Sequence, residues 1–255
     1  MTDRATYIKA RFQTGHKNSS VASENVVSNL GIAEPTYFTQ PSTLFAAAAA
    51  TTETASSAGG ARSVVVFGLG SGYIEQTEKM WLDGTSPVPS AKLWLRVDNT
   101  WVQDVGSLGV NQAHIWFGAN NSFTAGAPNN KITIICSGRG ECLNGAFSVP
   151  NSVEAHVHNL IFNSGKAGGG DVISTFDIRW RPLDVESGAI YSWRTAYVVD
   201  VFDGDTSGQA EADNMVIPGP ADIQIRSKGS AVGAQQSFII GYELHKTLQG
   251  VRGIF

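Results

Sequence analysis

Short runs in which apolar and polar residues alternate recur along most of this chain and predict β-strands. The alternation is clear in Leu93 to Val97, in Val153 to Phe162 and in Asp171 to Arg181. Because side chains two positions apart lie on the same face of a strand, each run can bury one face and expose the other. Glycine or proline interrupts the runs about every ten residues, and no amphipathic helical segment lies between them. The pattern predicts an antiparallel, all-β protein.

The strand-like runs fall into two groups, which predicts two domains. The first group extends from Arg62 to about Ser137, the second begins at Ala146, and a glycine-containing break at residues 138–145 separates them. Regularly spaced strands without intervening helices favour sandwiches over a parallel sheet. We therefore expect two stacked β-sandwiches of jelly-roll type, over residues 36–142 and 143–255.

Two segments lack a clear period. Residues 1–35 show no sustained alternation, and we expect an extended N-terminal arm that is ordered only where it meets a partner or the rest of the fold. The alanine run within residues 41–61 has high intrinsic helix propensity. Its serine and threonine neighbours and its lack of amphipathic spacing favour a strand followed by a loop.

Composition and charge exclude several kinds of partner. The chain has 255 residues, of which 42% are hydrophobic and only 16% charged, and its net charge is −4. Lysine and arginine are scattered singly, so we expect no nucleic-acid partner. No segment approaches the ~20 apolar residues of a membrane span, so we expect no membrane. The polar N-terminal segment has no apolar core of a secretory signal, which indicates synthesis in a cytoplasm. The low charge suggests a surface rich in turns or covered by other subunits.

The two cysteines, Cys136 and Cys142, are six residues apart. They could close a small disulfide loop or form half of a metal site. A zinc site would need two further ligands at short spacing, and none follows. In a reducing compartment, one buried strand thiol and one loop thiol is the simpler interpretation.

The glycine-rich run at residues 68–72 resembles a phosphate-binding loop, because it follows an apolar strand-like run. Phosphate binding requires a helix N-terminus directly after the glycines. Here Tyr73 to Leu82 contains threonine and aromatic residues, and Asp83 and Gly84 soon end it. The spacing of the last glycine also differs, so the run favours a hairpin turn.

Histidines at alternate positions provide the first candidate metal site. His156 and His158 project from one face of a strand-like run, His114 could join from the other domain, and Glu154 could orient a ring nitrogen. On a polar strand face such histidines commonly face solvent instead. We expect no metal there.

A second candidate lies in residues 203–214. Oxygen donors alternate with other residues from Asp203 onward and glycine is sixth, as in the first half of a calcium-binding loop. Asn214 occupies the twelfth position, where a bidentate glutamate is expected. Glu211 and Asp213 could still hold a hard cation weakly, although a solvated loop between strands is the simpler interpretation.

No enzyme signature is visible. The chain lacks a Gly-x-Ser-x-Gly elbow and a His-Glu-x-x-His motif, and nothing local marks a pair of catalytic carboxylates. Tryptophans could form sugar-stacking platforms, but four of them, Trp81, Trp94, Trp101 and Trp116, lie in strand-like runs, where packing in a core or between subunits is commoner. We predict no catalytic, cofactor-binding or metal-binding residues, no cofactor, and a protein that is not an enzyme.

Three segments resemble virion structural proteins of tailed bacteriophages, especially those of marine and cyanobacterial hosts: Ser63–Ser107, Ala155–Pro182 and Ile217–Leu244. The shared pattern is a hydrophobic strand, a glycine turn, a threonine-rich strand and a closing aliphatic-glycine-aromatic strand. The turn at Gly70–Gly72 departs from it, because an aspartate is more usual there. The resemblance implies a protein located in the virion, where it decorates the capsid or belongs to the neck or tail.

Such proteins are repeated subunits that bury apolar surface between copies. The resemblance therefore implies a homo-oligomer, a trimer or larger, that also contacts other virion proteins. The alternative is a displayed receptor- or carbohydrate-binding β-sandwich, and a third hypothesis is a glycan hydrolase or lyase. An exposed row of aromatic residues beside carboxylates would favour sugar binding, whereas buried tryptophans would favour the structural protein.

Overall fold

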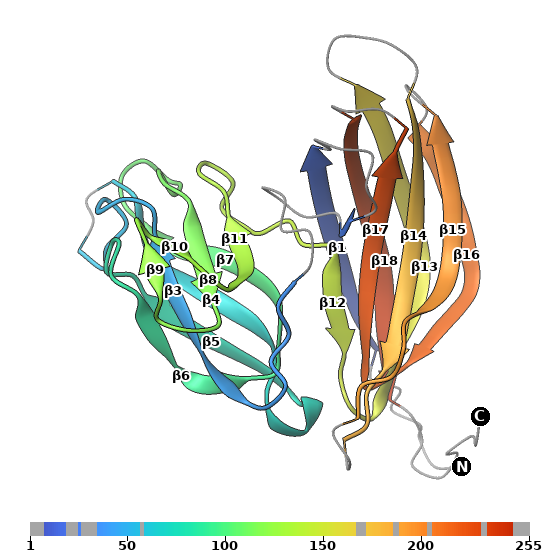
Figure 1. Ribbon diagram of the computed structural model, residues 1–255, viewed down its shortest axis with the longest axis horizontal. Helices are drawn as coiled ribbons and strands as arrows, with labels where there is room; N and C mark the ends of the chain where they lie inside the picture. The colour runs from blue at the N-terminus through green and yellow to red at the C-terminus, as the bar shows by residue number, and fades with distance from the viewer. Residues whose placement is uncertain are drawn as a thin grey trace.

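The computed structural model describes residues 8–18, 25–26, 35–56, 59–166, 172–185, 189–202, 206–230 and 234–246. Within these ranges the chain forms strands and one short 3-10 turn, η2 (Ser71–Tyr73), and contains no α-helix, hence none that could cross a membrane. The strands build two sandwiches that lie side by side (Figure 1). The all-β prediction and its sandwich architecture are confirmed.

The strands of the first sandwich, β3 to β11, follow one another along the chain. One sheet has the order β11 (Lys131–Ile135), β8 (Ile115–Gly118), β3 (Ser42–Ala48), β6 (Val88–Trp94), and the other has the order β5 (Glu75–Trp81), β4 (Ala61–Leu69), β7 (Arg96–Val105). A small hairpin, β9 (Phe123–Thr124) and β10 (Ala127–Pro128), lies beside them. Buried side chains from both sheets, among them Leu44, Val64, Trp94 and Phe117, form a common core.

The second sandwich is larger and has a four-stranded sheet and a sheet of four strands in line with a fifth, two-residue strand added to it. One has the order β1 (Ile8–Asn18), β18 (Ala234–Lys246), β13 (Val153–Lys166), β16 (Thr206–Pro218), and the other has the order β12 (Ala146–Val149), β17 (Ala221–Gly229), β14 (Ile173–Pro182), β15 (Arg194–Phe202). The short β2 (Asn25–Val26) pairs with β17. If the eight strands other than β2 are numbered in chain order, the sheets are 1-8-3-6 and 2-7-4-5, which is the jelly-roll arrangement of two Greek keys.

This topology makes the first sandwich an insertion between the first two strands of the jelly roll. Cys142 is the last buried residue of the first hydrophobic core, and Phe147 is the first of the second. The change lies next to the expected boundary at residues 142 and 143. That these units are separate domains stays a prediction. The second one is not continuous in sequence, however, because it also contains β1.

Residues 1–35 were expected to form an extended arm that is ordered only where it meets a partner or the rest of the fold, and within this range Ile8–Asn18 is a strand of the jelly roll. That the whole range acts as an arm stays a prediction. The strand pairs with β18 in uninterrupted antiparallel register, from Ile8 opposite His245 to Asn18 opposite Gln235.

Of the β1 side chains whose burial is described, Arg11 is half-buried and Gln13 is buried, and both contact the first sandwich rather than a hydrophobic core. The sequence does alternate at Ile8, Ala10 and Phe12, but this pattern covers only part of the strand and the buried Gln13 does not belong to it.

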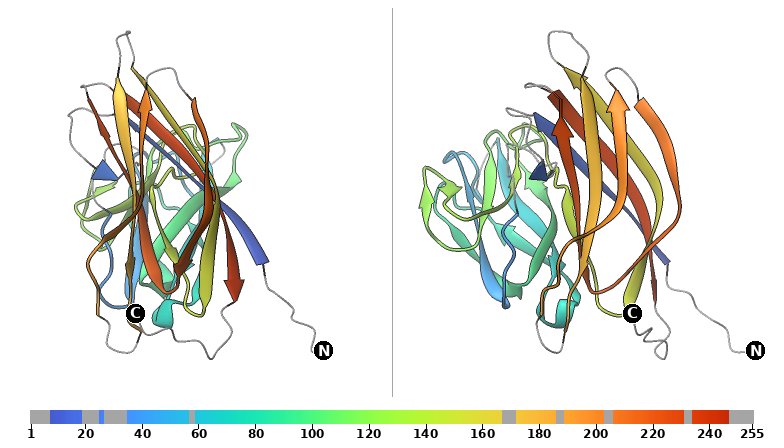
Figure 2. Two further views of the ribbon diagram at one scale, coloured as in Figure 1. Left: turned by 90° about the vertical axis from the view of Figure 1, so that its right-hand side faces the viewer. Right: turned by 45° about the vertical axis from the view of Figure 1, so that its right-hand side comes forward.

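The two sandwiches meet along one side of the jelly roll. Strands β1 and β12 lie next to the first sandwich, whereas β15 and β16 lie at the far side (Figure 1), and Figure 2 shows the arrangement from two further sides. The far side therefore faces away from the first sandwich (Figure 1).

Candidate functional site

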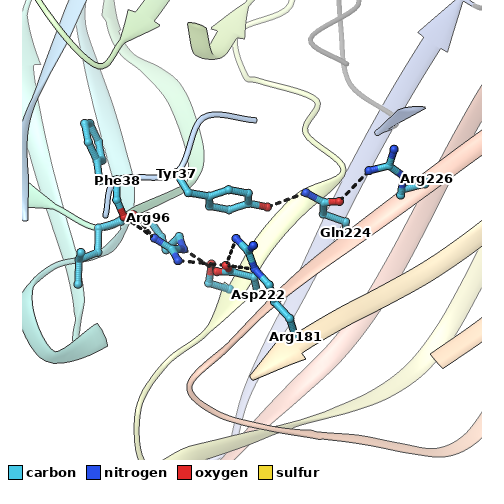
Figure 3. A network of polar contacts seen from close by, with 9 residues as sticks. Tyr37, Phe38, Arg96, Arg181, Asp222, Gln224 and Arg226 are labelled. Carbon is cyan, nitrogen blue, oxygen red and sulfur yellow. Dashed lines mark hydrogen bonds and ion pairs between the residues drawn. The ribbon is translucent and has the colours of Figure 1, made fainter. Parts of the chain in front are cut away.

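A polar cluster between the two sandwiches is centred on Asp222 of β17 (Figure 3). Its side chain is fully buried. Arg96 of β7 donates to it from Nε (2.6 Å) and Nη2 (3.0 Å). Arg181 of β14 donates to the Oδ2 atom from Nε (2.9 Å) and Nη2 (2.8 Å), and the Ser148 hydroxyl donates to Oδ1 (3.1 Å). One carboxylate thus joins two arginines, one from each sandwich.

Tyr37 completes this cluster. The guanidinium carbons of Arg96 and Arg181 lie 4.7 and 4.8 Å from the centre of its ring, and its hydroxyl accepts a hydrogen bond from Gln224 (3.0 Å). Arg96 also donates to the carbonyl of Phe38 (3.0 Å). Burial raises the pKa of Tyr37, so the phenol remains neutral. Every charged group here is engaged by a neighbour, an arrangement suited to holding the sandwiches together rather than to chemistry.

Strand β1 forms a second part of the interface. The Arg11 guanidinium lies 2.5 Å from the carboxylate of Glu75 and 4.2 Å from the centre of the Phe67 ring. The amide of Gln13 donates to the carbonyls of Asp98 (3.2 Å) and Asn144 (2.8 Å). The first strand of the jelly roll therefore binds the inserted sandwich directly.

Asp98 is a buried carboxyl at the same interface. It lies with Tyr37 and Phe147 in the lining of a small pocket between the sandwiches. Burial raises its pKa to about 8, against opposing effects of the Arg11 charge and a Ser148 hydrogen bond. The side chain is 5% exposed, so at neutral pH it is a neutral acid within the interface.

Replacement of Asp98 by asparagine is expected to remove a pH dependence of stability. The folded chain keeps this proton up to about pH 8, whereas the ordinary pKa is 3.8. Between these values the folded state binds more protons than the unfolded state, so stability falls as pH rises, by up to about 1.4 kcal/mol per pH unit. In Asp98→Asn the unfolding free energy from urea titrations should vary less with pH. An identical slope in both proteins would contradict the assignment.

The glycine-rich run at residues 68–72 forms a hairpin turn, as the sequence indicated. Leu69 at the end of β4 pairs with Glu75 at the start of β5, and η2 lies between them. Gly72 has φ of 67°, a conformation that glycine adopts without strain. No helix follows the glycines, so the run has no phosphate-binding geometry.

The histidines are brought together differently from the expectation. His156 and His158 do share the outer face of β13, but His114 lies in the first sandwich, where its Nδ1 accepts from the Ser137 amide. The ring of His156 instead stacks on His245 of β18, with centres 4.1 Å apart.

Two glutamates complete this outer-face histidine cluster. Glu154 lies 2.7 Å from the Nε2 atom of His156, and Glu243 lies 3.2 Å and 3.4 Å from the Nε2 atoms of His245 and His158. His245 escaped the sequence analysis because only the β13–β18 register brings it here. Among the described residues, no group of three or more potential ligands is placed to hold a metal ion.

The remaining candidates are the cysteine pair and the calcium-like segment. Cys136 and Cys142 are free thiols; burial raises the pKa of both, and Cys142 donates to the Asn99 side chain (3.0 Å). Residues 203–205 of the calcium-like segment lie outside the described residues. The expectation of a loop over the rest was wrong, because the backbone of residues 206–214 belongs to β16.

The tryptophans divide into two groups. Trp94 is fully buried and Trp116 is 8% exposed, in agreement with the packing role expected for strand tryptophans. Trp101 is half-buried, whereas Trp81 is 51% exposed at the end of β5. Buried tryptophans were expected for a structural protein and exposed ones for sugar binding. Trp94 and Trp116 agree with the first expectation, and Trp81 agrees with the second.

The chain matches no protein-family model and no curated protein. Among solved structures, it is similar to that of infectious bursal disease virus Gt strain, with 12% identity over 99% of this chain and 76% of that chain and a TM-score of 0.25. The VP2 subviral particle of the same virus gives 10% identity, coverages of 96% and 74%, and a TM-score of 0.25. The structure of the Gx strain gives 8% identity over 96% of this chain and 78% of that chain, with a TM-score of 0.24. Likenesses at these TM-scores carry no argument about function.

Proposed function

We propose that this protein is a non-enzymatic structural protein of a tailed-phage virion, which packs as a repeated subunit on the capsid or at the neck or tail. The three sequence segments that resemble such proteins all lie in the two sandwiches. The jelly roll of the second sandwich is an architecture that capsid domains use, as lectins and cupins also do. The buried, fully paired charges at the sandwich interface suit a rigid building block.

The observation that carries the proposal is a group of exposed apolar side chains at the far side of the jelly roll, on the outer face of β14 and β15, where the hydrogen-bonded pair Thr175 and Asp200 lies between them. Ile173 of β14 and Phe202 of β15 are directly opposite each other and are 41% and 55% exposed, and Val198 of β15 is 53% exposed. Strand β15 is also an edge of its sheet. Natural proteins usually cover or blunt an exposed apolar edge, and packing against another subunit would cover this one.

This surface supports a homo-oligomer, and we propose a trimer or larger that also binds other virion proteins. Closed symmetric contacts are the usual way in which identical subunits bury such surface. The protein would be made in the host cytoplasm and would then be incorporated into the virion.

The purified full-length chain is expected to sediment as a trimer or larger species at micromolar concentration. Val198→Lys, which puts a charge into the apolar edge of β15, should shift the protein toward the monomer. The matched control is Leu93→Lys, because Leu93 is similarly exposed (52%) but belongs to β6 of the first sandwich. A wild-type monomer with no tendency to associate would contradict the proposal and favour the displayed binding module.

A further inference from the structure

The outer face of the sheet β5-β4-β7 carries a layer of aromatic and polar side chains. Val64 and Val66 of β4 point into the core of the first sandwich, so Ser63 and Val65 belong to the opposite, outer face. Directly opposite residues of antiparallel neighbours share a face. The register places four side chains here: Trp81 and Asp104 flank Ser63, and Lys79 and Trp101 flank Val65.

We name this layer the Trp81 patch, and it consists of two groups of contacting side chains: Trp81, Lys79 and Asp104 form one, and Trp101 and Gln103 form the other. The Lys79 ammonium lies 2.6 Å from the Asp104 carboxylate and 4.1 Å from the centre of the Trp81 ring. The indole N–H of Trp101 donates to the Gln103 side chain (3.2 Å). Hydrogen bonds from Lys79 and Ser63 lower the pKa of Asp104, so its carboxylate is ionised and available as an acceptor.

The Trp81 patch is accessible to solvent, although the outward-facing side chains of β4 between its members are buried. Ser63 is fully buried and Val65 is 6% exposed, so side chains of the neighbouring strands cover β4. Trp81 is 51% exposed, and the side chains of Lys79 and Asp104 are 40% and 39% exposed. Because Lys79 occupies one face of the indole, the accessible face of Trp81 is the opposite one.

The two tryptophans are spaced for an extended ligand. They lie on strands on either side of β4 and are offset by two residues along it. With neighbouring strands ~4.8 Å apart and a rise of ~3.3 Å per residue, their backbones are ~12 Å apart. That distance is comparable to the length of a short oligosaccharide.

We propose that the Trp81 patch binds a short, neutral oligosaccharide. The apolar C–H face of one sugar ring stacks on Trp81, and Trp101 supports the other end. Asp104 accepts hydrogen bonds from sugar hydroxyls, while Lys79 and Gln103 donate to them. The Asp104 carboxylate and the net charge of −4 disfavour a phosphate-bearing ligand. This site goes beyond the proposed structural function, because it lies on the first sandwich, away from the apolar edge of β15.

The test is calorimetric titration of the full-length protein with maltotriose, cellotriose and the trimer of N-acetylglucosamine, each to millimolar concentration. We expect at least one of them to bind. Trp81→Ala should weaken that binding by about tenfold or more, the effect of losing a central aromatic anchor. Leu93→Ala, which removes a similarly exposed side chain from β6, should leave the affinity unchanged.

Gln103→Ala is the second variant, in case Trp81→Ala does not fold; it should weaken binding without changing the circular dichroism spectrum. If none of the three sugars binds, or if both variants bind as tightly as the wild type, the proposal is wrong. Sedimentation of the same variants separates this proposal from the structural one. Variants of the Trp81 patch should associate like the wild type whether or not they bind sugar.

Discussion

Deletion of residues 1–18 is expected to abolish the cooperative folding of the jelly roll. The deletion removes β1, which pairs with β18 over eleven residues, and leaves β18 as an unpaired edge above the core. It also removes Arg11 and Gln13 from the interface with the inserted sandwich. Each lost hydrogen bond costs about 1 kcal/mol, so losing the whole ladder approaches the total stability of a domain, about 5–15 kcal/mol.

Urea unfolding followed by circular dichroism and by tryptophan fluorescence measures this effect. The matched control is Gln13→Ala, which keeps the β1 backbone and leaves only the carbonyls of Asp98 and Asn144 without their donor. That variant should cost about 1–3 kcal/mol and still fold. A shortened chain that unfolds as cooperatively as the full one, and loses only its assembly, would show instead that the segment acts as an arm.

The sequence predicts those strands whose buried face is apolar. In β13, Ala155 and Val157 alternate with polar residues and are indeed buried. Strand β3 was also recognised despite its alanines, since Leu44 and Ala46 pack in the core of the first sandwich. The alternation of apolar and polar residues is a local signal. It arises within one strand, when one face of that strand is buried and the other faces solvent.

The first strand could not be predicted in this way. Its buried Gln13 is satisfied by carbonyls of the inserted sandwich, and its partner β18 lies at the other end of the chain. The jelly-roll order depends on these long-range pairings and is therefore invisible in the local pattern. The same reason explains why two β-sandwiches could be expected, but not that one is inserted into the other.

The interface site was equally hidden. Arg96, Arg181 and Asp222 are far apart in sequence, and each is flanked by ordinary strand residues. Only the packing of β7 against the sheet that contains β14 and β17 brings them together. Trp81, by contrast, was recognised from the sequence as a strand tryptophan. That Lys79 and Asp104 lie beside it follows only from the pairing of β5 and β7 with β4.

Replacement of Asp222 by alanine is expected to destabilise the protein by about 3–5 kcal/mol, because it leaves the buried charge of Arg96 and the partly buried charge of Arg181 without their shared carboxylate. The side chain of Arg96 is 1% exposed and that of Arg181 is 13% exposed, so water cannot replace the lost partner at either position without opening the interface. The measurement is the unfolding free energy from urea titration.

Asp222→Asn is the informative control for this prediction. The amide oxygen still accepts a hydrogen bond from an arginine, but the negative charge is gone, so the loss in Asp222→Asn measures mainly the charge. If charge neutralisation holds the two sandwiches together, both variants are strongly destabilised. A loss below about 1 kcal/mol in Asp222→Ala, the range of a solvent-exposed ion pair, would show that the cluster does not hold the interface. The sandwiches would then be held by contacts outside the cluster, among them those of Arg11 and Gln13 of β1.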